Sequence, residues 1–203
     1  MVHCLYCEPA EAYTGDSRFI SSRKKRDSGG KVMVKILLVI LEIGVSLIAV
    51  WLLTFLSFFL HELGHAAGHM LATGDRNWHI RVGWGKQLLN TKKLAVNLIV
   101  FDGYFTPAQT EYATKAKLIA MLAGGPAVSM LLFAGFLALK LSGLSFQSDF
   151  LADGTVEWFL NYPLYLNLML FVSSLLPMHY PWGEAKGMAS DGLKIFRVLK
   201  SRE

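Results

Sequence analysis

The apolar residues of this 203-residue chain gather in three long runs, at about 36–60, 118–139 and 158–177. A helix needs about 20 apolar residues to cross the hydrocarbon core of a bilayer, and each run meets that length. The first run carries one charge, Glu42, and continues without a break signal beyond residue 60. The pattern therefore predicts three transmembrane helices, over about 36–72, 118–139 and 158–177.

Two shorter runs lie between the first and second predicted helices. Residues 78–85 and 94–101 are rich in β-branched and aromatic side chains, and a polar stretch separates them. This pattern predicts the two strands of a hairpin, over about 78–105. Because open sheet edges do not survive in lipid, we expect the hairpin at the membrane surface or in space lined by protein. The predicted fold is thus an all-α membrane core of about three transmembrane helices with a small membrane-associated β-hairpin between helices 1 and 2.

The remaining segments complete the predicted domain organisation. Residues 1–32 are polar and show no period, which predicts a flexible basic tail. Residues 33–203 would form one membrane domain, with a C-terminal helix over about 191–200. At 53% hydrophobic residues and a mean hydropathy of +0.40, the chain is more apolar than a soluble domain. Its net charge of +5 comes mostly from basic residues beside the apolar runs, so no nucleic-acid partner is expected.

The distribution of basic residues predicts the orientation of a multi-pass integral membrane protein. Segment 73–117 holds seven Lys or Arg, and segment 178–203 is also basic, whereas 141–156 holds none. Cytoplasmic loops carry the excess of Lys and Arg, so the first two segments should be cytoplasmic, with the active site near that face. The orientation of the basic tail stays open, and its isolated Cys4-x-x-Cys7 pair is assigned no function.

The segment His61-Glu62-Leu63-Gly64-His65 carries the clearest chemistry. On a helix, His61 and His65 lie about 40° apart and one turn from each other, so both imidazoles can hold one ion. Zinc held there would activate a water molecule and polarise a carbonyl, while Glu62 would accept the proton. The alternative without function is a pair of core histidines whose hydrogen bonds are made within the protein. Ionisable groups at the end of an apolar helix are costly in a bilayer, which favours the functional interpretation.

A catalytic zinc site needs a third protein ligand. His69 continues the histidine stripe, but three ligands on one straight helix cannot converge on a tetrahedral ion, so we expect it to pack or to support the site. The candidates further along the chain are Glu157, His179, Glu184 and Asp191.

Small residues recur at four-residue spacing in the second predicted helix. Ala120, Gly124 and Val128, with Gly125 and Ser129 beside them, are typical of a face that packs closely against another helix. We expect this face to pack against the helix that carries the histidines and to seal the metal site.

Several segments appear in one order along the chain. They are the His61–His65 motif, Ala-Gly-Gly-Pro-Ala at 123–127, Asn167 through Leu-Leu-Pro at 175–177, and Ser-Asp-Gly at 190–192. Taken together they resemble the site-2 protease family, intramembrane zinc metalloproteases of the M50-like class. The resemblance covers about 61–195, and the segment ending Asp102-Gly103-Tyr104 is similar to the glycine-containing hairpin of that family.

The resemblance implies one zinc ion per chain, held by His61, His65 and Asp191, with Glu62 as catalytic base. It also implies substrate contacts at Gly103 and at Asn167 or Ser174. The chain departs from the family because Ser174 stands where the family has asparagine before Leu-Leu-Pro, and because Asp191 follows Pro177 by fourteen positions. The alternative role for Asp191 is a helix cap, since Ser190-Asp191 precedes a helical segment, and capping is compatible with ligation.

The resemblance implies a zinc-dependent endopeptidase that cleaves membrane-embedded or juxtamembrane protein segments. Its expected partners are a transmembrane protein substrate, membrane lipid and a regulatory membrane protein. One alternative is a membrane zinc protease of the prenyl-protein-processing type, which would take glutamate, Glu157 or Glu184, as third ligand. Another is a non-catalytic metal-binding scaffold, which has no need of Glu62.

Overall fold

The computed structural model describes residues 17–143, 153–181 and 185–201. Within these ranges the chain forms four helices and one two-stranded antiparallel sheet. It divides into two compact units, Met1–Leu47 and Ile48–Glu203, which we describe separately. Cys4, Cys7 and Glu184 lie outside the described residues.

Helix α1 spans Ser17–Thr73, and its first part forms the described portion of the first unit. Residues 17–32, which the sequence pattern assigns to a flexible basic tail, are part of α1, while residues 1–16 are not described. Segment 17–32 contains no proline, and the lysines and arginines at 23–26 are good helix formers. The helix therefore extends backward from the apolar run, even though Gly29-Gly30 is unfavourable within it. The charged composition that suggests a tail does not prevent a helix.

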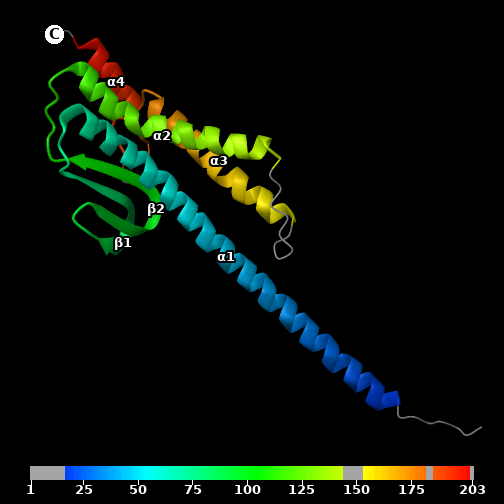
Figure 1. Ribbon diagram of the computed structural model, residues 1–203. Coiled ribbons are helices and arrows are strands. Elements are labelled where there is room, and N and C mark those ends of the chain that lie inside the picture. The colour runs from blue at the N-terminus through cyan, green and yellow to red at the C-terminus, as the bar shows by residue number, and fades with distance from the viewer. Residues whose placement is uncertain (1–16, 144–152, 182–184, 202–203) are drawn as a thin grey trace, which may run out of the picture. The chain divides into compact units, whose positions relative to one another are not determined.

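In the second unit, the later part of α1 packs against a hairpin made of β1, Trp78–Asn90, and β2, Leu94–Pro107. Ala66 of α1 and Ile80, Val82 and Val100 of the hairpin form the buried core. In Figure 1 the hairpin lies on one side of this part of α1, and α2 lies on the other. The predicted two-stranded hairpin is confirmed.

The hairpin bends strongly along its length. Residues 80–82 of β1 pair with 103–105 of β2 and also with 94–96 at the start of the same strand. Gly83, with φ of 77°, lies at this bend, and a side chain there would collide with the carbonyl of Ile99. Glycine tolerates positive φ without steric cost, so the bend depends on it.

Helix α2, Lys115–Leu141, begins at an N-cap, Thr114, and crosses α1 at close range. A Cβ added at Gly64 would meet the carbonyl oxygen of Gly124, and one added at Gly68 would lie 2.6 Å from the carbonyl oxygen of Ala120. The small-residue face predicted for this helix is thus confirmed as a helix-packing face. The crossing brings the backbones of the two helices together at the histidine segment.

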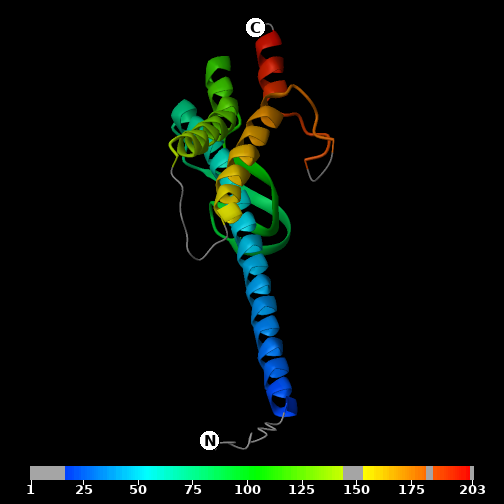
Figure 2. The ribbon, with the colours of Figure 1, turned by 90° about the vertical axis from the view of Figure 1, so that its right-hand side faces the viewer.

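Helices α3, Asp153–Leu175, and α4, Asp191–Lys200, complete the second unit. The two helices come close where α3 ends, because Ser190 Oγ donates to the Leu176 carbonyl and Gly192 lies against the carbonyl of Leu175. Figure 2 shows α4 starting beside the end of α3. Two helical segments, Lys31–Thr73 and Lys115–Leu141, are long and apolar enough to cross a membrane by length and composition.

Over its described residues, α3 is not apolar enough to be a candidate membrane span by the same criterion. Its Asn161, Pro163, Asn167 and Ser174 lower its hydropathy relative to α1 and α2. The structure therefore gives a helical protein with two candidate membrane spans and a small sheet. The third transmembrane helix predicted over about 158–177 stays a prediction.

Candidate metal centre

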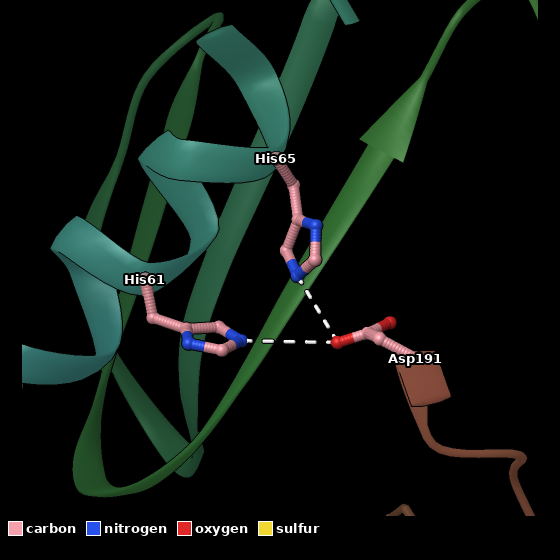
Figure 3. A group of neighbouring side chains, drawn as sticks. All are labelled: His61, His65 and Asp191. Atoms are coloured by element: carbon pink, nitrogen blue, oxygen red, sulfur yellow. Dashed lines mark ion pairs between the residues drawn. The ribbon is translucent and has the colours of Figure 1, made fainter. Parts of the chain in front are cut away.

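Three side chains from distant parts of the chain converge beside the α1–α2 crossing. Asp191 Oδ2 lies 3.2 Å from His65 Nε2 and 3.9 Å from His61 Nε2. Figure 3 shows the two imidazoles extending from successive turns of α1 toward the Asp191 carboxylate at the start of α4. One ligand atom from each residue lies within 4.8 Å of the other two, and all three residues are buried. This group could hold a metal ion.

The second nitrogen of each imidazole has its own partner. His65 Nδ1 lies 2.9 Å from the carbonyl oxygen of Met121, and His61 Nδ1 lies 2.8 Å from Ser129 Oγ. A carbonyl can only accept, so the His65 Nδ1 carries a proton, and a neutral ring then has its lone pair on Nε2. Such hydrogen bonds orient metal-ligating histidines, and both partners come from α2. Helix α2 thus directs the Nε2 atoms toward Asp191.

Asp191 is placed by the start of α4. The N-cap Ser190 accepts a hydrogen bond from Leu193 N at 3.1 Å and one from Met178 N at 3.2 Å. These bonds fix the first turn of α4 against the chain that follows α3. Ser190, and not Asp191, therefore caps the N-terminus of α4. The Asp191 carboxylate is directed at the imidazoles instead.

The electrostatics of Asp191 favour its ionised form. Burial alone would raise the pKa of this carboxyl, but contacts with His61 and His65 and the charge of Lys194 hold the pKa below its usual range. Lys194 Nζ lies 3.2 Å from Asp191 Oδ1, the oxygen that does not face His65. One carboxylate oxygen is thus paired with lysine, while the other faces the two histidines. A carboxylate must be ionised to bind a metal, and the lowered pKa of Asp191 favours that form.

Gly125 of α2 leaves space between the imidazoles. A Cβ at this position would lie 2.7 Å from His61 Nε2 and closer still to His65 Nε2. Any other residue would fill the space next to both Nε2 atoms. The two nitrogens, the carboxylate oxygen and this gap fit a single metal ion with a further position left for water or substrate.

Glu62 lies in the same cavity as the three candidate ligands. The cavity has a volume of about 620 Å³ and includes His61, Glu62, His65 and Asp191 in its lining. Gly103 of β2 lets the hairpin backbone approach Glu62, since a Cβ there would lie 2.7 Å from Glu62 Oε1. The other lining residues are mainly apolar or aromatic and include Phe105, Leu118, Met121, Leu122, Tyr180, Met188 and Val198.

The remaining ligand candidates lie elsewhere. His69 is fully buried, with Nδ1 2.9 Å from the Tyr112 hydroxyl and Nε2 3.7 Å from Asp75 Oδ2. It is not among the residues that line the cavity.

The candidates further along the chain have other partners. Glu157 lies 3.9 Å from Lys140 Nζ on the exposed side of α3. His179 Nε2 lies 3.1 Å from Arg197 Nη2. Among the described candidates for a third ligand, Asp191 alone meets both His61 and His65.

The three predicted substrate contacts differ in position. Gly103 lines the cavity. Asn167 is fully buried between α1 and α3, where its Nδ2 donates to Ser57 Oγ at 3.1 Å and to the Pro163 carbonyl at 2.8 Å. Ser174 is also buried and donates to the Phe171 carbonyl at 3.1 Å. The structure therefore places Gly103, and neither Asn167 nor Ser174, at the cavity surface.

Sequence reasoning missed two partners of the site. The Met121 carbonyl carries no side-chain signal, and the contact depends on the crossing of two helices. Tyr180 belongs to the segment between α3 and α4, which has no periodic pattern. Ser129 was visible only as a small residue in a packing face, although a hydroxyl within such a face is a candidate hydrogen-bond partner.

Comparisons with protein-family models, with curated proteins and with solved structures find no significant match to this chain.

Proposed function

We propose that this protein is a zinc-dependent endopeptidase that cleaves membrane-embedded or juxtamembrane segments of other proteins. The observation that carries the proposal is that His61, His65 and Asp191 converge in a cavity that also contains Glu62. Two histidines, a carboxylate and a neighbouring glutamate are the residue types of a hydrolytic zinc site. Ligand atoms of a tetrahedral zinc ion lie about 3.3 Å apart, close to the 3.2 and 3.9 Å found between Asp191 and the imidazoles.

In this proposal, each residue of the site has a separate role in the hydrolysis. Zinc, when bound, would polarise the scissile carbonyl and lower the pKa of a water molecule. Glu62 accepts the proton of the attacking water and returns it to the leaving amine. Ser129 and the Met121 carbonyl hold the imidazole rings in place, and the walls of the cavity are mainly apolar.

The membrane setting is part of the proposal. The exposed side chains of α1 between Val32 and Ile48 are almost all large and apolar, which suits lipid rather than water. We infer a multi-pass membrane protein with α3 as a third span, a hairpin associated with the membrane and an active site near the cytoplasmic face. The substrate would be a transmembrane protein, and lipid and a regulatory membrane protein would be further partners.

The order of motifs supports membership of the site-2 protease family, because the residues that match its zinc ligands are those that meet in space. In the prenyl-protein-processing type a glutamate would complete the site, and Glu157 lies beside Lys140 instead. A non-catalytic metal holder would gain nothing from a buried Glu62 at the cavity wall.

The first test is the zinc content of the detergent-purified protein beside that of Asp191→Asn and Glu157→Gln. We expect about one zinc per chain in the wild type and in Glu157→Gln, and loss of zinc in Asp191→Asn, because a three-ligand catalytic site cannot spare a ligand. Zinc retained in Asp191→Asn and lost in Glu157→Gln would point to the prenyl-processing type. A wild type that binds no zinc would overturn the proposal.

A further inference from the structure

Tyr180 lines the cavity from the segment between α3 and α4. Its backbone is held in a short antiparallel pairing, in which Tyr180 N donates to the Met188 carbonyl at 3.0 Å and Gly187 N donates to the Tyr180 carbonyl at 2.9 Å. The neighbouring His179 contacts Arg197 of α4 and so joins the pairing to the helix that carries Asp191. The ring of Tyr180 is therefore presented to the cavity by a hydrogen-bonded support.

The hydroxyl of Tyr180 makes no hydrogen bond to any residue that the structure describes. Two other tyrosines line the cavity and differ from Tyr180: Tyr104 is 43% exposed, and the Tyr112 hydroxyl shares a hydrogen bond with His69 Nδ1 at 2.9 Å. A phenol has one proton to donate. In Tyr180 that proton is available to a molecule in the cavity, whereas in Tyr112 the hydroxyl is engaged within the protein.

The surroundings keep the Tyr180 phenol protonated. Burial, followed by the negative charges of Asp191, Glu62 and Asp102, raises the pKa of Tyr180 to about 12. Asp191 and Glu62, the side chains proposed for metal binding and catalysis, line the same cavity as Tyr180. At physiological pH the group is therefore a neutral hydrogen-bond donor.

We propose that the Tyr180 hydroxyl donates a hydrogen bond to the oxygen of the scissile carbonyl as that oxygen becomes negatively charged. This inference rests on the proposed function and adds a catalytic residue to it. When water attacks, its oxygen bonds to the carbonyl carbon, the carbonyl π pair moves onto the carbonyl oxygen, and one water proton passes to Glu62. The pair on the oxyanion then re-forms the C=O bond as the C–N bond breaks, the electron pair of that bond stays with nitrogen, and nitrogen receives the proton from Glu62. Tyr180 keeps its proton throughout and stabilises the charge.

The test compares two tyrosine variants in the zinc-loaded, detergent-purified full chain. Tyr180→Phe removes only the free hydroxyl, and Tyr112→Phe is the matched control with an engaged hydroxyl. With a mixture of apolar-helix peptides as substrate and mass spectrometry of the products, we expect kcat/KM of Tyr180→Phe to fall about 10²–10³-fold, the usual cost of losing one oxyanion donor. KM and zinc content should stay near wild type, and Tyr112→Phe should lose far less activity.

A second measurement does not depend on turnover. A phosphinic peptide carries a tetrahedral, anionic centre in place of the scissile amide, so its affinity reports on the stabilisation of the oxyanion. We expect Tyr180→Phe to bind it about 10²-fold more weakly, and to bind a planar amide peptide as well as the wild type does when both carry Glu62→Gln. If Tyr180→Phe matches Tyr112→Phe in turnover and in phosphinate affinity, the inference is overturned while the proposed function stands. If Glu62→Gln is as active as the wild type, the proposed function fails and the inference fails with it.

Discussion

The two parts of helix α1 have opposite surfaces. From Val32 to Ile48 its side chains are mainly large, apolar and exposed, and no part of its most apolar window is buried. From Thr54 to His69 the same helix buries polar and ionisable side chains. These are Thr54, Ser57, His61, Glu62, His65 and His69. One helix thus exposes its apolar residues in one part and buries its polar residues in the other.

This contrast follows from the free energies of exposing apolar side chains and of burying polar ones. Exposed apolar side chains are unfavourable in water but not in lipid. Buried polar groups need partners, and most of those in the later part of α1 have them. Thr54 bonds to Tyr162, Ser57 to Asn167 and His61 to Ser129. Between Thr54 and His69 the helix contributes to a polar interior, which a metal centre requires.

The sharpest test of the contrast uses the two glutamates of α1. Glu62 lies buried in the cavity and Glu42 is exposed in the earlier part of the helix. Glu62→Gln should lower kcat by about 10²–10⁴-fold, because the amide cannot accept the water proton. Glu42→Gln should leave kcat unchanged. Cleavage of the apolar-helix peptides measures both, with zinc content as the control. Equal activity in the two variants would remove Glu62 from the chemistry.

A second pair of variants extends the comparison to α2, which the later part of α1 faces. A Cβ at Gly125 would enter the space beside His61 Nε2 and His65 Nε2, whereas a Cβ at Gly135 would meet nothing within 4 Å. Gly125→Ala should therefore lose zinc and activity, and Gly135→Ala should keep both. Zinc per chain after dialysis against a weak chelator distinguishes them. A zinc-loaded, active Gly125→Ala would mean that the ion sits away from this glycine.

The sequence predicts the parts of this site that follow from local geometry. His61, Glu62 and His65 share one helix, so their spacing alone indicates an ion-binding pair with an adjacent base. Asp191 lies far along the chain, and spacing leaves it equal to Glu157, Glu184 and His179. The resemblance of the motifs singles it out, and the close approach of α3 and α4 at Gly192 is what brings it to the histidines.

Other features depend on contacts that no local pattern encodes. Helix α1 includes residues 17–32 because basic residues are compatible with a helix, although the same residues predict a flexible tail. The role of Tyr180 depends on backbone pairing within an irregular segment. His69 continues the histidine stripe in sequence, but in the structure it contacts Tyr112 and Asp75 and does not line the cavity.

The last prediction concerns stability and uses two glycines of α1. A Cβ at Gly68 would lie 2.6 Å from the Ala120 carbonyl oxygen and 2.9 Å from Met121 Cα, so the backbones of α1 and α2 would have to separate. A Cβ at Gly44 would meet nothing within 4 Å. Gly68→Ala should lower the free energy of unfolding by about 1–3 kcal/mol, the typical cost of overpacking. Gly44→Ala should leave it unchanged or raise it by up to about 1 kcal/mol, because alanine favours helix. Unfolding by SDS in mixed micelles measures both variants against the wild type. If Gly44→Ala destabilises the protein as much as Gly68→Ala does, the earlier part of α1 packs against protein as well, and the contrast between the two parts of the helix is lost.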